Sequence, residues 1–218
     1  MNNLLRRIYG FVAGKRFSTS SEYWQRRYLD RGNSGSGSYG RLAHFKAAVL
    51  NDLVKSKGVE SVVEFGCGDG AQLALASYPI YLGVDVSPAA VDTCKARFAG
   101  DQSKSFMTLD SFRQVRPTAD LGLSLDVIYH LVEDAVFDEY MRDLFGASKR
   151  LVAVYSSNSN AIVDPAPHVR HRAFTDWVVQ HATDWRLVSA HRNPYPHRWY
   201  NRKNTSPCDF YVFEKQAG

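Results

Sequence analysis

Three glycines occupy alternate positions in the stretch VVEFGCGDG, residues 62–70. This order predicts a buried strand, a tight turn and then a helix, because glycine adopts positive φ and lets the backbone approach a ligand closely. The next apolar run, residues 80–84, ends in Asp85. A carboxylate at the tip of a neighbouring parallel strand can accept hydrogen bonds from a ribose diol. Together the two features predict a site for an adenosine-containing cofactor.

The spacing of the glycines and two acids beside them narrow the choice of cofactor. The nicotinamide and flavin fingerprint is G-x-G-x-x-G, with a pyrophosphate at the helix N-terminus, and this turn lacks that spacing. Glu64 and Asp69 would repel a pyrophosphate but suit a cationic ligand, such as a sulfonium with an ammonium group. No G-K-[ST] follows, which excludes a P-loop.

This turn resembles the first motif, E/D-x-G-x-G-x-G, of the class I methyltransferases that depend on S-adenosyl-L-methionine (SAM). The resemblance covers residues 60–215 and points to the small-molecule and glycan-type branch of this Rossmann-like family. It implies SAM as the cofactor and S-adenosyl-L-homocysteine (SAH) as its product. It also implies an N-terminal helical lid over residues 1–41, with a Gly/Ser-rich loop, and a methyltransferase domain over residues 42–218.

Alternating strand and helix patterns predict an α/β fold with a doubly wound, mostly parallel seven-stranded sheet. The last two strands resemble the antiparallel hairpin that ends the family's sheet. Strands are predicted at residues 61–65, 80–84, 105–109, 121–125, 150–155, 186–190 and 210–213. Helices are predicted within residues 1–30 and at residues 42–57, 71–77, 89–98, 133–145 and 175–182.

Ligands of such sheets lie beyond the carboxyl ends of the strands, which selects the cofactor candidates. Glu64 and Asp69 are candidates for the methionine amino group, and Asp85 for the ribose hydroxyls. By resemblance, Asp110 would accept from the adenine amine, although a helix N-cap is the alternative role. The full set of candidates is Glu64, Phe65, Gly66, Cys67, Gly68, Asp69, Gly70, Asp85, Val86, Asp110, Ser111, Phe112 and Leu125.

The fourth strand ends in SLDVIYH, residues 124–130, where the family's strand runs under the methionine portion of the cofactor. Asp126 and His130 are therefore the candidate catalytic residues. The near-neutral pKa of an ordinary imidazole suits a general base that takes a proton from a hydroxyl or an amine. The alternative is that His130 only packs on the following helix.

Two polar segments and the residues beside the Gly/Ser-rich loop of the expected lid supply candidates for binding the methyl acceptor. SSNSN, residues 156–160, could bind hydroxyl groups, and an extended HVRHR, residues 168–172, would point three cations to one side. A plain loop and a solvated rim are the alternatives. The substrate-binding candidates are Tyr39, Arg41, Tyr129, Ser156, Asn158, His168, Arg170 and Arg172.

Two other sites are set aside. NPYP, residues 193–196, is similar to the N-P-P-Y motif of amino-group methyltransferases, but it follows the sixth strand and its order is wrong. No metal site is predicted, because Asp126 has no obvious carboxylate partner and Cys67, Cys94 and Cys208 lack metal-ligand spacing.

The composition of the chain is typical of a single globular domain. The 218 residues are 44% hydrophobic and 22% charged, as in one globular domain. An odd cysteine count and the lack of a signal-peptide core or a spanning apolar run predict a cytoplasmic protein. The net charge is +5, and residues 1–21 contain four basic residues and no acid before Glu22. Residues 1–17 could therefore contact a membrane surface peripherally.

The sequence thus predicts a SAM-dependent methyltransferase that acts on a small, polar, hydroxylated acceptor. A sugar, a glycan or an anionic metabolite fits best, with O-methylation favoured. An RNA or protein methyltransferase is the alternative, because the chain is basic, although the misplaced NPYP weakens a nucleic-acid partner. A non-catalytic SAM-binding protein is the second alternative. The oligomeric state is left open.

Overall fold

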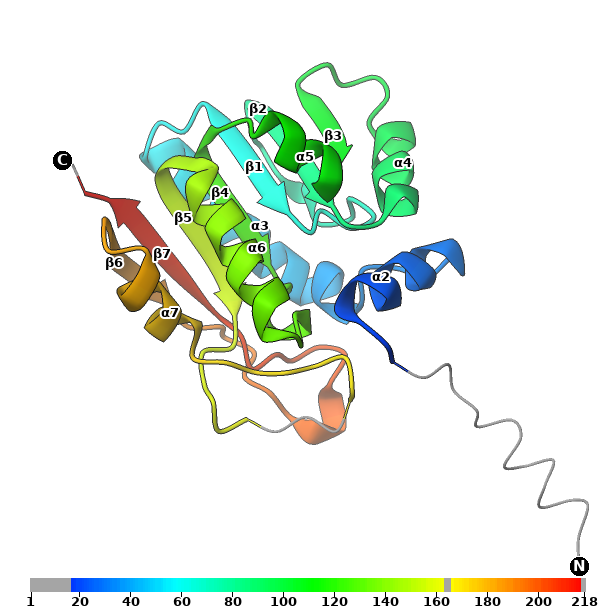
Figure 1. The fold of residues 1–218 in the computed structure, drawn as a ribbon, viewed down its shortest axis with the longest axis vertical. Coiled ribbons are helices and arrows are strands. Elements are labelled where there is room, and N and C mark those ends of the chain that lie inside the picture. The colour runs from blue at the N-terminus through cyan, green and yellow to red at the C-terminus, as the bar shows by residue number, and fades with distance from the viewer. Residues whose placement is uncertain (1–16, 163–165, 217–218) are drawn as a thin grey trace, which may run out of the picture.

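The computed structural model describes residues 17–162 and 166–216 (Figure 1). The expectations for residues 1–16 lie outside the described residues. The strands form one sheet in the order β3-β2-β1-β4-β5-β7-β6, in which β7 is antiparallel to both of its neighbours and the other pairs are parallel. The strands are β1 (Ser61–Phe65), β2 (Ile80–Asp85), β3 (Lys104–Thr108), β4 (Ala119–Leu125), β5 (Ser148–Ser156), β6 (Trp185–His191) and β7 (Asp209–Lys215). The predicted seven-stranded α/β sheet is confirmed.

Helices cover both faces of the sheet. The α-helices are α2 (Ser20–Leu29), α3 (Gly40–Ser56), α4 (Pro88–Arg97), α5 (Leu109–Val115), α6 (Asp134–Gly146) and α7 (Phe174–His181). Buried side chains of α5, α6 and α7 share one apolar cluster, and those of α3 and α4 share the other. Alternate residues of the inner strands enter opposite clusters, as a strand buried on both faces requires.

Local sequence explains where several elements begin. Ser87 caps α4 by accepting a hydrogen bond from the Ala90 N–H, and Pro88 occupies the first turn. Thr108 caps α5 in the same way. The predicted strand at residues 105–109 therefore ends one residue earlier, and helix α5 was missed. The predicted helix at residues 71–77 is only a 3₁₀ turn, η2 (Leu73–Leu75).

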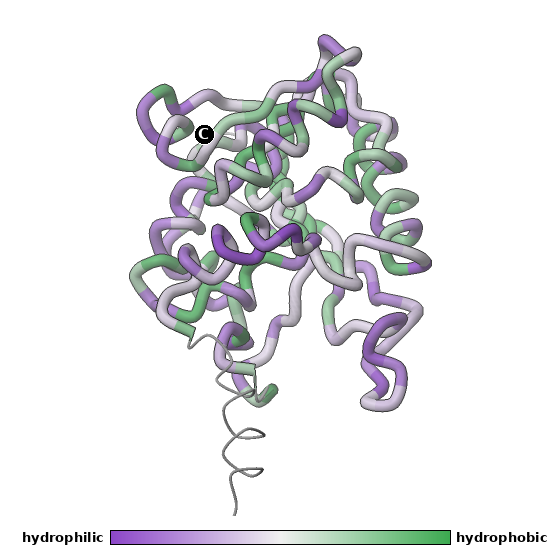
Figure 2. The backbone as a smooth tube through the Cα atoms, turned by 90° about the vertical axis from the view of Figure 1, so that its right-hand side faces the viewer, coloured by the Kyte–Doolittle hydropathy of each residue, from purple (hydrophilic) through white to green (hydrophobic). Residues whose placement is uncertain are grey.

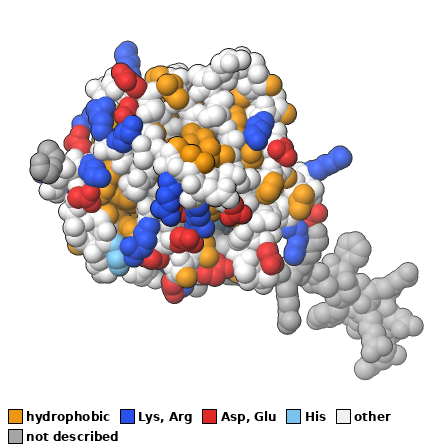
Figure 3. Space-filling view, turned by 45° about the horizontal axis from the view of Figure 1, so that its top comes forward, with side chains coloured by type: hydrophobic (Ala, Val, Ile, Leu, Met, Phe, Trp, Pro, Cys, Tyr) orange, Lys and Arg blue, Asp and Glu red, His pale blue; other side chains and the backbone are white. Residues whose placement is uncertain are grey.

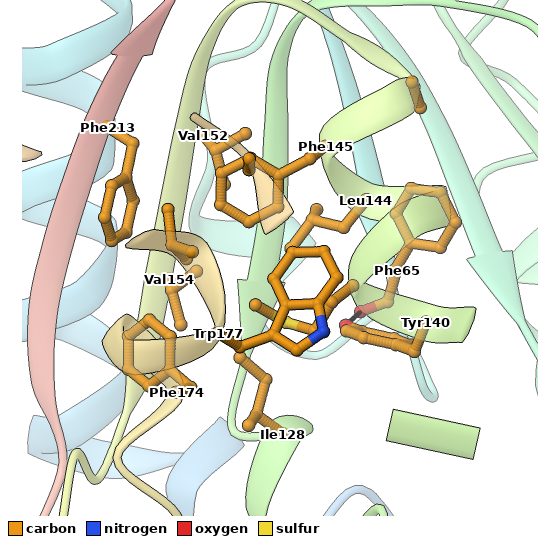
Figure 4. Close-up of a cluster of buried hydrophobic side chains, with 14 of the residues drawn as sticks. Phe65, Ile128, Tyr140, Leu144, Phe145, Val152, Val154, Phe174, Trp177 and Phe213 are labelled. Atoms are coloured by element: carbon orange, nitrogen blue, oxygen red, sulfur yellow. Dashed lines mark hydrogen bonds between the residues drawn. The ribbon is translucent and has the colours of Figure 1, made fainter. Parts of the chain in front are cut away.

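The larger core cluster fills the space between the sheet and helices α6 and α7 (Figure 4). Phe65 and Tyr140 meet there edge to face, with ring centroids 5.8 Å apart. The Tyr140 hydroxyl donates to the Phe65 carbonyl at 3.1 Å, which satisfies two polar groups inside the core. Hydrophilic and hydrophobic residues alternate along the coiled parts of the backbone as well as in the loops (Figure 2).

Helix α2 lies at the edge of the sheet where the parallel strands end (Figure 1). Thr19 caps it, and the Ser20 N–H and hydroxyl donate to the Glu133 carboxylate at 2.9 and 2.6 Å. Residues 31–39 follow as a loop that contains the short 3₁₀ turn η1 (Ser36–Ser38). This segment, called the 31–39 loop below, connects α2 to α3.

Candidate functional site

A pocket opens at the carboxyl edge of the sheet, between the ends of β1, β2 and β4 and helix α2. The strand ends form one side, and α2 with the 31–39 loop forms the other. The lining residues are Ser20, Ser21, Trp24, Tyr28, Ser34, Ser38, Phe65, Gly66, Val84, Asp85, Val86, Leu109, Arg113, Leu125, Asp126, Val127, His130, Leu131, Val136 and Tyr140.

The glycine turn needs glycine at each of its three positions. Gly66, Gly68 and Gly70 all have positive φ, between 58° and 82°. A Cβ on Gly66 would lie 2.4 Å from a Val127 methyl group, and one on Gly68 would lie 2.2 Å from the Ser34 hydroxyl oxygen. Backbone and neighbouring elements therefore approach here more closely than any side chain permits.

Asp85 joins this turn to the tip of β2. Its two carboxylate oxygens accept the Gly68 N–H and the Ser87 N–H, both at 2.9 Å. Each oxygen keeps a further lone pair that could accept a ribose hydroxyl. Burial raises the pKa of Asp85 to about 6, against the opposing effect of these backbone hydrogen bonds. The carboxylate is therefore mainly ionised at neutral pH.

Two predicted cofactor residues of the turn face away from the pocket. Glu64 is buried, and its carboxylate accepts the Tyr81 hydroxyl at 2.7 Å on the face of the sheet that α3 covers. Burial raises the pKa of Glu64 to about 7. Cys67 packs in the same apolar cluster, beside Gly83. Neither residue lines the pocket.

Asp69 holds the 31–39 loop against the glycine turn. Its carboxylate accepts the Ser34 N–H at 3.1 Å and the Tyr39 hydroxyl, and its own N–H donates to the Ser34 hydroxyl at 2.9 Å. Although burial opposes it, the pKa of Asp69 is lowered by these hydrogen bonds and by the Ala71 N–H. Asp69 therefore binds the loop, whereas the sequence predicted a contact with the methionine amino group.

After β3, the residue that lines the pocket is not one of the candidates chosen from the sequence. Leu109 lines the pocket, whereas Asp110 and Ser111 are exposed in the first turn of α5. Phe112 points into the core, where its ring meets that of Phe65 with centroids 4.8 Å apart. Leu109, the first residue of α5, thus offers the pocket an apolar surface.

Asp126, at the end of β4, lies in a buried polar network. Lys46 of α3 is 1% exposed, and its Nζ lies 2.6 Å from Asp126 Oδ2. The Tyr129 hydroxyl donates to Asp126 Oδ1 at 3.0 Å. Asp126 has a φ of 60°, which is uncommon for a residue with a side chain and indicates a constrained position. Both carboxylate oxygens are therefore engaged inside the protein.

His130 lines the pocket from the 3₁₀ turn η3 (Ile128–His130). Its Nδ1 lies 3.0 Å from the His168 carbonyl oxygen, which can only accept a hydrogen bond. This contact assigns the proton of the neutral ring to Nδ1 and leaves Nε2 unprotonated. Burial lowers the pKa of His130 to about 4, and the Trp24 ring meets it edge to face at 4.9 Å.

The segment 168–172 does not form an extended cationic face. The His168 ring stacks between Tyr23, at 4.2 Å, and His130, at 5.6 Å. Arg172 is 8% exposed and donates to the carbonyls of Leu131 and Val132 and to Asp134. Arg170 also binds the Val132 carbonyl and Asp134, and neither arginine lines the pocket. The arginines hold the chain between η3 and α6.

The other predicted acceptor residues also lie outside the pocket lining. Ser156 is buried, and its hydroxyl has no hydrogen-bond partner in the described part of the chain. The Asn158 side chain binds Thr175, the second residue of α7. Arg41 donates to the Asn204 carbonyl at 2.7 Å and covers the Tyr195 ring at 4.3 Å.

Several solved structures have a fold similar to that of this chain. N-methyltransferase NodS from Bradyrhizobium japonicum WM9, in complex with SAH, superposes with a TM-score of 0.69 and 16% identity over 92% of this chain and 100% of that chain. Magnesium protoporphyrin IX methyltransferase ChlM from Synechocystis PCC 6803, with bound SAM, gives 0.65 and 13% over 94% and 100%. The methyltransferase domain of bacterial CtHen1 gives 0.60 and 21% over 80% and 98%. This chain has the class I methyltransferase fold.

No family model and no curated protein sequence matches the chain, so the fold rests on structure alone. Among the described residues, no cluster of three histidine, cysteine or acidic side chains could hold a metal ion. Cys67, Cys94 and Cys208 are free thiols. None of the helices in residues 17–162 and 166–216 combines the length and apolar character needed to cross a bilayer.

The sequence missed the residues that α2 and α3 bring to the site. Ser20, Ser21, Trp24 and Tyr28 lie at spacings of three and four, which place them on one helical face. The sequence placed these residues in the expected N-terminal helical lid but did not single out this face. Lys46 offered a clearer signal, since a lysine within an apolar helical face needs a buried anionic partner. Nothing in the sequence identified Asp126 as that partner.

Proposed function

We propose that this protein is a SAM-dependent methyltransferase that acts on a small, polar, hydroxylated acceptor. The observation that carries the proposal is the shared pocket. The ribose candidate Asp85 and the apolar residues Val86 and Leu109, beyond the strand ends, line the same cavity as serine and aromatic residues of α2. A donor and an acceptor can therefore meet inside it, which is the requirement for direct transfer between two bound molecules.

The residues present fit SAM. Gly66 lines the pocket without a side chain, and Asp85 retains acceptor capacity for the ribose diol. Val86 and Leu109 supply apolar surface for the adenine ring. Bound SAM would supply an electrophilic methyl group on its sulfonium. The contacts of Glu64 and Asp69 make them supports of the turn in this proposal.

The chain's own contribution to transfer is to orient the acceptor hydroxyl and to take its proton. His130 suits the second task, because its Nε2 is unprotonated at neutral pH and it lines the pocket. Asp126 suits it less well, because Lys46 and Tyr129 occupy both of its oxygens. We assign Asp126 to positioning and His130 to proton transfer.

We favour a small acceptor because α2 and the 31–39 loop enclose the pocket. Helix α2 is tied to Glu133 and its Tyr28 hydroxyl lies where a Cβ on Gly68 would point, while the 31–39 loop is tied to Asp69. Both therefore cover the glycine turn. A folded protein or a duplex could not enter such a pocket without displacing them. The hydroxyls of Ser21 and Ser38 favour a polar acceptor, whereas those of Ser20 and Ser34 are engaged within the protein. Ser21 and Ser38 replace the SSNSN segment, which does not line the pocket, as the support for a hydroxylated substrate.

Binding and transfer are tested separately. Calorimetric titration with SAH should show one site per chain, and the absence of SAH binding would overturn the whole proposal. Methyl-labelled SAM should then label sugars or hydroxylated anionic metabolites in the presence of the enzyme. Labelling only of RNA or of protein would overturn the acceptor class while leaving methyl transfer in place. SAH binding without labelling of any acceptor would favour a non-catalytic SAM-binding protein.

A further inference from the structure

The connection between β6 and β7, residues 192–208, carries a concentration of exposed cations and aromatic rings. We call it the β6–β7 loop. It contains no acidic residue, and the nearest acids along the chain are Asp184 and Asp209. Its exposed basic and aromatic side chains are Arg192, His197, Arg198, Trp199, Tyr200, Arg202 and Lys203. On the face of the molecule shown in Figure 3, by contrast, Lys and Arg lie among Asp and Glu.

The loop is held in shape by buried polar contacts at its base. The Asn193 amide donates to the carbonyls of Tyr195 and Ser206, both at 3.1 Å, and its backbone N–H donates to Asp209 at 2.8 Å. The Thr205 hydroxyl donates to the Asn201 carbonyl at 2.7 Å. Asn193 belongs to the NPYP tetrapeptide, whose role here is thus to build the loop. A preorganised loop loses less entropy when it binds.

The loop presents its most apolar surface to solvent. Trp199 is 81% exposed and Tyr200 is 64% exposed, in the 3₁₀ turn η4 (Trp199–Asn201). Their rings are adjacent and nearly perpendicular, with centroids 5.7 Å apart and an interplanar angle of 89°. Two neighbouring aromatic residues with polar edges, flanked by cations, match the groups that sit at a membrane–water interface.

We propose that the β6–β7 loop docks this protein on an anionic membrane surface. Trp199 and Tyr200 enter the headgroup region, while Lys203 and the neighbouring arginines attract the negative lipids. A single-stranded nucleic acid fits less well, because successive bases need aromatic faces aligned along a groove. The nearly perpendicular rings of Trp199 and Tyr200 offer no such alignment.

The β6–β7 loop lies at the same edge of the sheet as the pocket, so docking of the loop would also orient the pocket. The loop starts where β6 ends, and β7 pairs with β5 so that Asp209 lies opposite Ser156, the carboxyl end of β5. The loop therefore lies at the same edge of the sheet as the pocket. Arg41, the second residue of α3, contacts its Asn204 carbonyl and Tyr195 ring. Docking would bring the edge that holds the pocket to the membrane surface.

Sedimentation of the full chain with vesicles tests the proposal independently of any methyl transfer. Vesicles of phosphatidylcholine with phosphatidylserine should bind the protein at low salt, and vesicles of phosphatidylcholine alone should bind it much more weakly. Lys203→Gln should weaken binding to the anionic vesicles roughly fivefold, as expected for one basic residue near the surface. Trp199→Ala should weaken it roughly tenfold, since the large ring no longer leaves water.

Matched variants separate docking from general charge. Lys149→Gln removes an exposed cation at the start of β5, on the opposite edge of the sheet, and should leave binding unchanged. Trp199 is too exposed to support the core, so Trp199→Ala should keep the wild-type melting temperature. Equal losses for Lys203→Gln and Lys149→Gln would overturn the proposal, as would full binding by Trp199→Ala. Tighter binding to a single-stranded oligonucleotide than to anionic vesicles would assign the loop to nucleic acid instead.

Discussion

The pocket has two sides that are built in different ways. The side proposed for the methyl donor, called the donor side, is the glycine turn with Asp85, in which the Gly68 N–H and the Asp85 carboxylate meet across seventeen residues of sequence. The side proposed for the acceptor, called the acceptor side, joins α2, η3 and the segment around His168, so that Trp24, His130 and His168 meet from distant parts of the chain. A short motif specifies the first side, whereas the second depends on how the whole domain packs.

The two sides also differ in what holds them. Backbone groups fix the donor side, because Asp85 accepts two main-chain N–H groups and the glycines leave no space for a side chain. Side chains fix the acceptor side, through the Tyr23–His168–His130 stack and the Arg172 contacts. Backbone geometry tolerates few sequences, while a side-chain arrangement can vary with the acceptor.

The largest effect is expected from His130→Gln on the acceptor side. Loss of the proton acceptor should lower kcat by about 10²–10⁴-fold, while SAH affinity stays near wild type. Because the pKa of His130 is about 4, its basic form persists above that pH, and kcat/KM should show no inflection from this group between about pH 6 and 8. Steady-state rates over this range check both points. His181→Gln, which alters a ring stacked on Trp177 outside the pocket, is the control.

Arg172→Gln tests whether Arg172 stabilises the acceptor side or binds an anionic acceptor. Removal of the guanidinium leaves the carbonyls of Leu131 and Val132 without this donor, so the free energy of unfolding should fall by about 2–4 kcal/mol. Arg170→Gln removes a half-exposed arginine with overlapping partners and should cost less than about 1 kcal/mol. Urea unfolding measures both. A stable Arg172→Gln protein with impaired acceptor binding would restore the predicted anion-binding role.

Gly68→Ala tests the donor side. Its Cβ would require a φ of 58° and would meet the Ser34 hydroxyl, so we expect SAH affinity to fall by about tenfold or more, roughly 1–3 kcal/mol. Gly100→Ala is the matched control, because its Cβ meets open space. Calorimetric titration with SAH compares the two. Unchanged affinity in Gly68→Ala would show that the 31–39 loop can move off the turn without cost.

Glu64→Gln is expected to change stability and to spare cofactor binding. Glu64 in the folded protein holds its proton to about pH 7, above its ordinary pKa of 4.5, so wild-type stability should fall as pH rises through this interval. Glutamine does not titrate, so the variant should not lose stability in this way. Its free energy of unfolding relative to wild type should therefore rise by about 1–3 kcal/mol between about pH 4 and pH 8. Urea unfolding at both pH values, with exposed Glu60→Gln as the control, measures this change. A large loss of SAH affinity would instead return Glu64 to the cofactor site.

The sequence by itself determined the fold, the glycine turn and the position of Asp85. Each of these depends on local rules: alternation of apolar residues, positive φ at glycine and the end of a parallel strand. It also placed Asp126 and His130 at the end of β4, where both line the pocket. The division at residue 41 and the roles of individual site residues stay predictions.

Only the tertiary structure decided what each candidate side chain contacts. Glu64 is hydrogen-bonded to Tyr81, Asp69 to the 31–39 loop and Arg172 to the chain before α6. Buried charged groups and carbonyls need hydrogen-bond partners, and packing determines which partners are within reach. The pairing of Lys46 with Asp126 spans 80 residues of sequence. No local pattern encodes such a contact, since it exists only once α3 is packed against the sheet.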